Sequence, residues 1–421
     1  MSEISAIDAW EVLDSRGHPT VCVAVETAHA SGRFTVPAGA STGTHEAVER
    51  RDGTARYRGR GVRSAVAAIN DELAPIVVGR DVSEQRTIDE AMCAYDGTET
   101  LSEVGANAIL GVSGAVAHAA SNALDTPLYR YLAPDEPGRI PLPMVNVLSG
   151  GLHAEGGIEI QDFLVVPIGA ETYDDALRMV WDVRQAVRDR IVKEGHRPLV
   201  ADEGGFSPPM NSIDDAFVLL ETGVRDAGYE PGTDLSFAID VAATHFYDED
   251  QDAYELESIG KSLCPTEMID HVVEWTTRYP LVSIEDPLAE DDWEHWIQLH
   301  DKLGDTVQLL GDDLLVTDQK RLERVRETGA ANAVLVKPNQ TGTITGTIEL
   351  IQAAHRAGFS TVVSARSGET SDTTIADLAV AFDAGQIKIG SLARSERLVK
   401  YNRLIEISRE RGDEVTPFPF H

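Results

Sequence analysis

The chain has little cysteine and no long apolar run. Its three cysteines, Cys22, Cys93 and Cys264, lie far apart and form no CxxC pair, which argues against a disulfide framework or a thiolate metal site. The most apolar stretch, AILGVSGAVAHAASNAL at 108–124, is rich in small residues and too broken to span a membrane. The N-terminus shows no basic region followed by an apolar stretch, so we predict no secretory signal and a cytoplasmic location.

Positive charge is also scarce. Lys and Arg total 36 against 70 Asp and Glu, which gives a formal net charge of -34, and lysine occurs at only seven positions. An acidic surface repels nucleic acid and anionic lipid, so we expect neither nucleic acid nor a membrane as a partner. With 421 residues and 42% hydrophobic content, the chain is long enough for a full core and for two domains.

The character of the sequence changes between residues 130 and 140. Residues 1–130 mix alternating segments such as TVCVAVETA with helical stretches such as VRSAVAAINDELAPIVVG, which predicts an α+β domain. Residues 140–421 alternate short apolar runs with longer amphipathic stretches such as DDALRMVWDVRQAVRDRIVKEG. That alternation predicts βα units and a parallel sheet, hence an α/β fold in this second domain.

Six short apolar runs of the second domain each lead to a charged residue. These residues are Asp240, Glu285, Asp312, Lys337, Arg366 and Lys388. Their spacing mostly equals one strand, one helix and two loops, which predicts a (β/α)8-type barrel with these groups at the active-site rim. Strands also end in charged residues simply because they reach solvent, but three acids followed by three bases in chain order favour a shared pocket.

The three acids suit a hard metal ion. Asp240, Glu285 and Asp312 offer oxygen ligands from neighbouring strands, which fits Mg²⁺ and fits Zn²⁺ poorly without His or Cys. Without a cation, three clustered carboxylates would repel one another. The three basic residues then predict that the bound species is a multiply charged anion that also touches the metal.

Each basic residue suits a separate task. Lys337 follows the apolar run NAVLV, and burial beside a metal and another lysine favours the neutral amine, which is a competent general base. Arg366 with Ser367 and the Gly368 backbone offers a planar fork and a hydroxyl, as phosphate recognition requires. Lys388 would pair with a carboxylate or a developing enolate.

Two earlier segments complete the candidate site. VPAGASTGTHEA at 36–47 is glycine-rich, contains Ser41 and Thr42, and could close over a phosphate as a lid, although an ordinary surface turn has the same composition. ADEGGFSP places Glu203 before two glycines and beside the apolar RPLVA, which suits a general acid.

Taken together, these segments resemble the enolase (phosphopyruvate hydratase) family over nearly the whole chain. The motifs that carry the resemblance stand in the family's order: DSRGHPTV, GASTGTHEA, NAILGVS, DEGGFSP, SIEDPLAEDDW, GDDLLVTD, KPNQTGT, RSGETSDT and IKIGSLARSERLVKYN. The resemblance implies an N-terminal α+β domain that caps a modified barrel of the ββαα(βα)6 type. It also implies a small phosphorylated carboxylate as substrate, and a homodimer or an assembly of dimers.

The resemblance further implies individual roles. Asp240, Glu285 and Asp312 look like the ligands of a first Mg²⁺, and Ser41 looks like a ligand of a second Mg²⁺ that arrives with the substrate phosphate. Lys337 looks like the base that removes the α-proton, and Glu203 like the acid that expels the β-hydroxyl. The remaining matches are Arg366 and Ser367 on the phosphate, Lys388 on the carboxylate, Gln161 among the substrate contacts, and His153 of GGLHAEGG near the leaving group.

Three positions depart from the family pattern. Ala365 stands where the family has a histidine that lines the substrate pocket beside the phosphate, so a donor is lost and space is opened. Asp162 stands where the family has a glutamate that partners Glu203, and its carboxylate reaches roughly 1 Å less far, a displacement that can cost about 10²-fold in rate. His18 replaces a usual asparagine, which we interpret as a scaffold change.

These departures leave three hypotheses, of which they favour the first. The first is a divergent paralogue with room for a larger group at the phosphate end, like carboxyphosphonoenolpyruvate synthase of phosphinate biosynthesis. The second is an ordinary glycolytic phosphopyruvate hydratase that tolerates both changes, with water replacing the imidazole. The third is a non-catalytic binding protein, which the presence of the full set of acids and bases disfavours.

Overall fold

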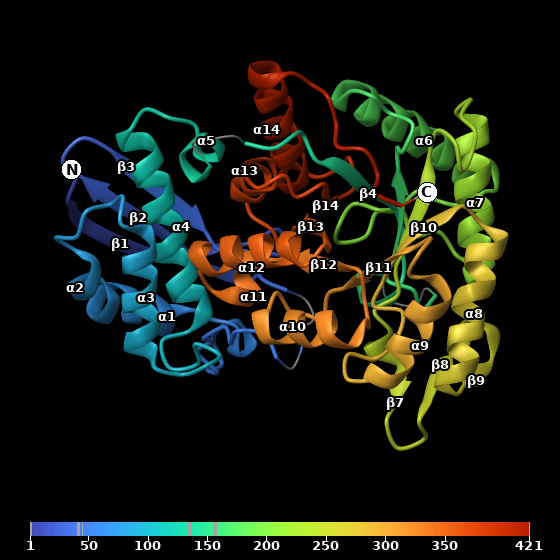
Figure 1. Ribbon diagram of the computed structural model, residues 1–421, viewed down its shortest axis with the longest axis horizontal. Helices are drawn as coiled ribbons and strands as arrows, with labels where there is room; N and C mark the ends of the chain where they lie inside the picture. Colours follow the sequence, from blue (N-terminus) through green and yellow to red (C-terminus); the bar gives the residue numbers. More distant parts are fainter. Residues whose placement is uncertain (1, 40–42, 44, 134–136, 155–157, 421) are drawn as a thin grey trace.

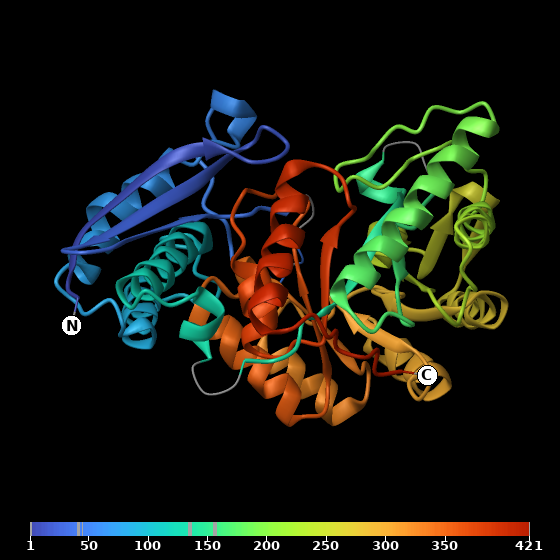
Figure 2. The same cartoon turned by 90° about the horizontal axis from the view of Figure 1, so that it is seen from above.

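The chain folds into two domains, described in a computed structural model for residues 2–39, 43, 45–133, 137–154 and 158–420. Figure 1 shows the N-terminal domain, in blue and cyan, beside a barrel that runs in colour from green to red. The C-terminal helices of the barrel, in orange and red, lie between the N-terminal domain and the green and yellow part of the barrel (Figure 2).

The N-terminal domain pairs a small sheet with one long helix. Strands β1 (Ile4–Leu13), β2 (Pro19–Thr27) and β3 (Ser31–Thr35) form an antiparallel sheet in that order. Helix α4 (Ala106–Ala123) packs along β2 and β3, and it is the small-residue stretch singled out above. Small residues allow this close approach: a Cβ on Gly114 would lie 2.4 Å from the Phe34 ring, and one on Gly32 would lie 2.1 Å from the Ala119 nitrogen.

The other helices of this domain are short. They are α1 (Arg63–Ala67), α2 (Ala74–Val77), α3 (Gln85–Asp96) and α5 (Leu128–Leu132), with the 3₁₀ turn η1 (Arg56–Gly59) and the π-helical turn η2 (Ala68–Leu73). Of these, α1, η2 and α2 pack against β1, and α3 packs against α4. The mixed sequence pattern therefore corresponds to an α+β unit.

Eight strands of the second domain close into a barrel in the order β10, β11, β12, β13, β14, β4, β5, β6. Their bounds are β4 (Leu142–Ser149), β5 (Asp162–Val166), β6 (Ser236–Asp240), β10 (Leu281–Glu285), β11 (Gln308–Gly311), β12 (Ala333–Val336), β13 (Ser360–Ser364) and β14 (Gln386–Gly390). All neighbours are parallel except β5, which is antiparallel to β4 and β6. Every residue of β12 and β14 is buried, as expected for strands covered on both faces.

Helices follow the strands around the barrel. They are α6 (Tyr173–Lys193), α7 (Ile213–Asp226), α8 (Pro265–Arg278), α9 (Trp293–Leu303), α10 (Gln319–Thr328), α11 (Pro338–Thr341), α12 (Ile344–Arg356), α13 (Thr374–Ala381) and α14 (Ser395–Arg411). Side chains of Thr172, Ser212 and Thr343 cap the amino ends of α6, α7 and α12, which fixes where these helices begin. The order ββαα(βα)6 confirms the predicted modified barrel with its α+β partner domain.

A short antiparallel sheet interrupts the barrel after β6. It consists of β7 (Tyr247–Asp248), β8 (Ala253–Leu256) and β9 (Lys261–Leu263), and it extends away from the barrel at the lower edge of Figure 1. No helix in the described part of the chain has the length and apolar character needed to cross a bilayer.

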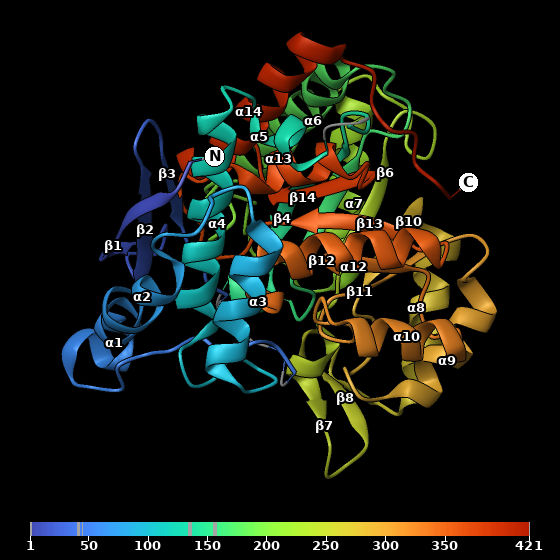
Figure 3. The ribbon, with the colours of Figure 1, turned by 60° about the vertical axis from the view of Figure 1, so that its left-hand side comes forward.

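Two hydrophobic cores support the domains, and residues of the barrel enter both. Ile344 of α12 and Leu378 of α13 belong to the core of the N-terminal domain. Helix α12 accordingly packs against α3 and α4, which lie beside it in Figure 3. The N-terminal domain is thus completed by side chains that come from the last third of the chain.

Candidate active site

The three predicted metal ligands lie at the carboxyl ends of three adjacent barrel strands. Asp240 ends β6, Glu285 ends β10, and the two residues are direct partners across the parallel pair. Asp312 directly follows β11, the next strand around the barrel. Parallel strands bring their carboxyl ends to one rim, so the fold gathers three acids that are far apart in the sequence.

Both lysines reach directly into this acidic group. Lys388 of β14 donates to Asp240 Oδ2 over 2.8 Å and to Glu285 Oε2 over 2.6 Å. Lys337, which follows β12, donates to Asp312 Oδ2. The resemblance gave Lys388 the substrate carboxylate as its partner. In the structure each lysine contacts the acids themselves, because buried carboxylates need a cation close by.

Glu285 has one oxygen that fits a metal ion. Its side chain is 3% exposed, and Oε1 is buried without a hydrogen-bond partner among the described residues. Burial raises the pKa of Glu285 well above its usual range, and the neighbouring Asp240 raises it further. Burial acts in the same direction on Asp240, but Lys388 outweighs it and lowers the pKa of Asp240 to about 2. An orphaned buried carboxylate oxygen beside an ionised one is a donor set that a divalent cation would satisfy.

The tightest groups of possible ligands are nevertheless different ones. Within the described residues, ligand atoms of Asp286, Asp312 and Asp313 lie within 4.8 Å of one another, as do those of His153, Asp162 and Glu203. The predicted trio of Asp240, Glu285 and Asp312 is not one of these groups. Asp312 belongs to both arrangements.

Asp286 organises the loop that carries Asp312, and sequence reasoning missed it. Its two carboxylate oxygens accept the backbone N–H groups of Asp312, at 3.0 Å, and Asp313, at 2.7 Å. Burial raises the pKa of Asp286 well above its usual range, and burial with the charge of Asp312 raises the pKa of Asp313 to about 8. The available signal was a pair of adjacent acidic residues at the end of β10 (ED) and another after β11 (DD). Sequence reasoning assigned a role to only the first residue of each pair.

Arg366 lies in a tight turn after β13, and side chains of other residues hydrogen-bond to both its backbone N–H and its backbone carbonyl. Its backbone N–H donates to Glu369, and its carbonyl accepts from Arg397 over 2.7 Å. Arg397 also donates to the Ser367 carbonyl over 2.7 Å. Burial would lower the pKa of Arg366, but Glu46 raises it more, so the guanidinium stays charged. The turn is therefore a rigid, cationic element, as the proposed phosphate clamp requires.

The described residues of the glycine-rich segment contact the barrel at two points. Ala38 and Gly368 exchange two backbone hydrogen bonds of 2.8 and 2.9 Å, and Ala47 donates to the Gln340 carbonyl over 3.1 Å. Ala38 is thus attached to the turn of Arg366, and Ala47 to α11, the helix that directly follows Lys337. Ser41, the predicted ligand of a second Mg²⁺, lies outside the described residues.

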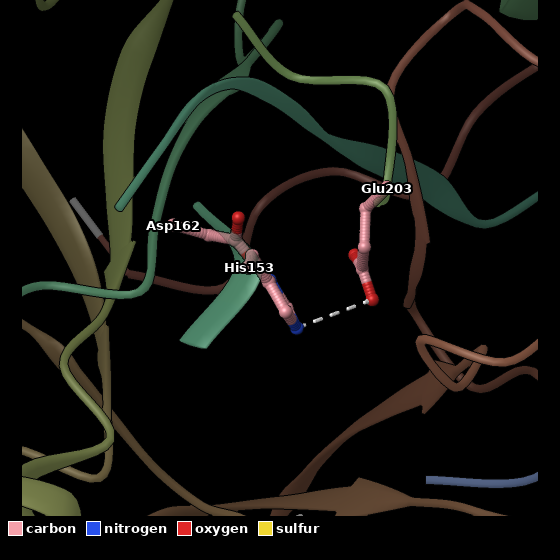
Figure 4. A group of neighbouring side chains, drawn as sticks. All are labelled: His153, Asp162 and Glu203. Atoms are coloured by element: carbon pink, nitrogen blue, oxygen red, sulfur yellow. Dashed lines mark hydrogen bonds and ion pairs between the residues drawn. The ribbon is translucent and has the colours of Figure 1, made fainter. Parts of the chain in front are cut away.

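His153 stands between the two carboxylates that were predicted to be partners. Figure 4 shows the arrangement: His153 Nδ1 lies 2.9 Å from Asp162 Oδ2, and Nε2 lies 3.9 Å from Glu203 Oε1. His153 ends the 3₁₀ turn η3 (Gly151–His153), and Asp162 begins β5. Asp162 therefore contacts His153, and the imidazole of His153 lies between Asp162 and Glu203. The short separation of His153 and Asp162 along the sequence, nine residues, was the available signal.

The charges of this group depend on one another. Burial would lower the pKa of His153, but Asp162 and Glu203 raise it to about 9. Burial would raise the pKa of Glu203, but Arg397, whose Nη1 lies 3.9 Å away, and His153 lower it below its usual range. At neutral pH the group holds a proton on His153 beside an ionised Glu203.

The two glycines after Glu203 allow its loop to fold against β4. Gly204 has φ +88°, and a Cβ on Gly205 would lie 2.6 Å from both Asn146 Oδ1 and Ser149 Oγ. The Glu203 carbonyl accepts from the Ser391 N–H over 2.8 Å, which ties the loop to the end of β14. The position of the carboxylate is therefore set by a backbone that only glycine permits.

Of the remaining residues singled out in the sequence, two lie at the rim of the barrel and one lies outside it. Gln161 is buried and donates to Asp240 Oδ2 over 3.1 Å, so it contacts a predicted metal ligand. Ala365 is buried beside Lys388, whose carbonyl its N–H reaches over 2.9 Å. His18 instead lies 3.2 Å from Nη1 of Arg60 and lines a cavity that Glu46 also lines.

Comparison with known proteins decides the family. Residues 4–132 match the family model of the enolase N-terminal domain, and residues 138–418 match that of the enolase C-terminal TIM barrel domain. The chain belongs to the enolase family. It is 50% identical over 414 residues to the protein named enolase of Acidothermus cellulolyticus, covering 98% of this chain and 96% of that relative.

This membership settles the broader part of the sequence-based prediction. The chain is an enzyme of the enolase family, a lyase similar to phosphopyruvate hydratase, so the hypothesis of a non-catalytic binding protein was wrong. The hypothesis that was favoured, a divergent paralogue of the carboxyphosphonoenolpyruvate synthase kind, gains no support from these comparisons. The relative named enolase instead favours the ordinary hydratase.

Proposed function

We propose that the protein is a phosphopyruvate hydratase, which removes water from 2-phosphoglycerate to give phosphoenolpyruvate in glycolysis. The observation that carries the proposal is the contact of both lysines with the metal-binding acids: Lys337 with Asp312, and Lys388 with Asp240 and Glu285. A base that must remove a proton from the carbon next to a metal-bound carboxylate needs to lie beside the metal ligands.

Asp240, Glu285 and Asp312 would hold Mg²⁺, since they offer hard oxygen donors and one of them has an orphaned buried oxygen. The ion supplies positive charge for the substrate carboxylate as that group gains negative charge in the reaction. In this proposal Ser41, outside the described residues, contributes to a second Mg²⁺ site. Arg366 and Ser367 bind the phosphate, and Lys388 with Gln161 borders the carboxylate.

The protein groups divide the two proton transfers. Lys337 is the general base that takes the proton from C2, which leaves the electron pair delocalised into the carboxylate. That pair then forms the C2–C3 double bond as the C3–O bond breaks, and the leaving hydroxide receives a proton to become water. The proton comes from the group of Glu203 and His153, and Asp162 keeps the imidazole in place through its 2.9 Å contact.

A direct assay tests the proposal. The purified protein is mixed with 2-phosphoglycerate and Mg²⁺, and the ultraviolet absorbance of phosphoenolpyruvate is followed beside an authentic enolase. A rate near that of the control is expected, and it would mean that Ala365 and Asp162 are compatible with the reaction. Absence of both turnover and α-proton exchange would overturn the proposal.

A second candidate rests on Ala365 alone. An alanine at the phosphate side of the pocket, where the family has histidine, favours a substrate with a larger group there, as in carboxyphosphonoenolpyruvate synthesis. The same assay separates the two candidates, because this enzyme would exchange the α-proton of 2-phosphoglycerate but release phosphoenolpyruvate several orders of magnitude more slowly than the control. A homodimer or an assembly of dimers remains a prediction of the resemblance, and a cytoplasmic location remains a prediction from the sequence.

A further inference from the structure

Glu46, from the glycine-rich segment of the N-terminal domain, is bonded to Arg366 of the barrel. Its Oε2 accepts from Arg366 Nη1 over 3.0 Å, and its Oε1 accepts from Nη2 over 3.3 Å. The side chains of Arg366 and Glu46 are 5% and 4% exposed. The pair is therefore a buried, two-pronged ion pair between the domains, a geometry that fixes the plane of the guanidinium as well as its position.

The same carboxylate contacts two other parts of the site. Glu46 Oε1 accepts from the Gly43 N–H over 3.1 Å and from Gln340 Nε2 over 3.1 Å. Gln340 in turn donates to Asp312 Oδ1 over 2.9 Å. Glu46 thus connects the glycine-rich segment, the proposed phosphate clamp and, through one amide, a proposed metal ligand.

We propose that Glu46 is a positioning residue that aligns Arg366 with the glycine-rich segment and moderates how strongly Arg366 attracts phosphate. The proposal rests on the assignment of Arg366 to the phosphate in the hydratase reaction. The Glu46 carboxylate offsets part of the charge of the buried Arg366 guanidinium. An incoming phosphate therefore meets a guanidinium that is oriented but already partly neutralised. Removing the Glu46 carboxylate takes one negative charge away from beside a buried cation, and a buried cation with less negative charge around it attracts anions more strongly.

Two opposite effects follow for Glu46→Gln. The amide keeps the shape but loses the charge, so inorganic phosphate should bind several-fold more tightly in the presence of Mg²⁺. At the same time the guanidinium loses its two-pronged partner, and misplacement of about 1 Å at such a site can cost about 10²-fold in rate. We therefore expect kcat to fall by roughly 10- to 100-fold, while KM falls or stays the same. A purely structural role would lower Tm without tightening phosphate binding.

The experiment compares wild type, Glu46→Gln and Glu323→Gln, the last as a matched control. Glu323 on α10 also pairs with an arginine, Arg326, through both carboxylate oxygens, but this pair is exposed to solvent. Phosphate affinity is measured by isothermal titration calorimetry, and kcat and KM by the absorbance assay. Tighter phosphate binding with a lower kcat in Glu46→Gln alone supports the proposal. Unchanged phosphate affinity or unchanged kcat in folded Glu46→Gln, or the same changes in Glu323→Gln, overturns it.

A second variant keeps the test decisive if Glu46→Gln does not fold. Glu46→Asp keeps the charge but withdraws the carboxylate, so phosphate affinity should stay near that of wild type while kcat falls. A wild-type kcat in this variant overturns the proposal. Failure of the hydratase assignment is seen separately, as a wild-type protein without turnover, and the phosphate titration still tests the link between Glu46 and Arg366.

Discussion

Lys388 and Glu285 meet across the mouth of the barrel, with 2.6 Å between Nζ and Oε2. Their strands, β14 and β10, are not neighbours, because β4, β5 and β6 lie between them on one side of the barrel and β11 to β13 on the other. The contact therefore spans the space above the strands, where the proposed metal and substrate bind. Each of the three acids there contacts a lysine. These contacts offset the repulsion among the carboxylates before any metal ion binds.

Lys337→Ala should remove α-proton exchange without removing metal binding. General-base catalysis contributes about 10²- to 10⁴-fold, so exchange of the C2 proton of 2-phosphoglycerate into solvent, followed by NMR, should fall by at least that amount. The three acids are unchanged, so calorimetry should still detect Mg²⁺ binding. Lys320→Ala, whose side chain is 79% exposed on the surface, is the control and should exchange normally. Retained exchange in Lys337→Ala would show that another group is the base.

Glu285→Gln should weaken Mg²⁺ binding while leaving the fold intact. Residues that only support a metal ligand already change affinity by about 10- to 100-fold, so loss of a direct ligand should raise the dissociation constant at least tenfold. The stabilisation by Mg²⁺ in a thermal melt should shrink in parallel. Glu255→Gln, on the small sheet away from the rim, should behave like wild type. Equal Mg²⁺ affinity in Glu285→Gln and wild type would remove Glu285 from the metal site.

The raised pKa of His153 predicts a loss of stability in alkali. The folded-state pKa is about 9 against the ordinary 6.5, so the protonated imidazole stabilises the fold fully below about pH 6.5, and this contribution is lost as the pH rises through 9. The difference corresponds to roughly 3 kcal/mol at most. His153→Gln should therefore show a smaller fall in the free energy of unfolding between pH 6.5 and 9.5 than wild type, measured with urea at each pH. Parallel pH profiles would contradict the ion pair with Asp162.

Ala365→His restores the residue that is usual in the family and separates the two candidate functions. If the protein is an ordinary hydratase, the added imidazole should leave kcat/KM for 2-phosphoglycerate unchanged or raise it. If the space beside Ala365 serves a larger substrate, turnover of 2-phosphoglycerate should rise by orders of magnitude as the site is converted. Ala365→Ser, which adds only a hydroxyl, is the size control and should change the rate little.

Gly114→Ala tests the packing of α4 on the sheet. The added Cβ would lie 2.4 Å from the Phe34 ring, and overpacking of this kind costs about 1–3 kcal/mol. The free energy of unfolding should fall by that amount, while KM for 2-phosphoglycerate in the folded protein stays the same. An unchanged stability would mean that Phe34 moves aside without cost.

The barrel and the members of its site followed from the sequence because both depend on local signals. Apolar runs of strand length, each followed by a charged residue, are visible without any knowledge of distant contacts, and Asp240, Glu285 and Asp312 were found in this way. The partners of these residues were not predictable, since they depend on which strands face one another across the barrel. Lys388 was therefore assigned to the substrate, although its protein partners come from β6 and β10.

The connections between elements were the other part that sequence reasoning missed. Asp162 was assigned to Glu203 on the family pattern, and the intervening His153 becomes visible only when η3 and β5 are placed together. Glu46 was passed over because HEA in a glycine-rich stretch has the composition of an exposed turn. Its burial follows from two anchor points, Ala38 on Gly368 and Ala47 on Gln340, each more than 290 residues away along the chain.

The barrel residues in the core of the N-terminal domain constrain how the chain can fold as it is synthesised. The strands and helices of that domain leave the ribosome first, but Ile344 and Leu378, which complete its core, are made only after most of the barrel. The nascent domain therefore exposes an apolar surface on α3 and α4 throughout that interval. We therefore expect the N-terminal domain to gain part of its stability late, when α12 and α13 dock.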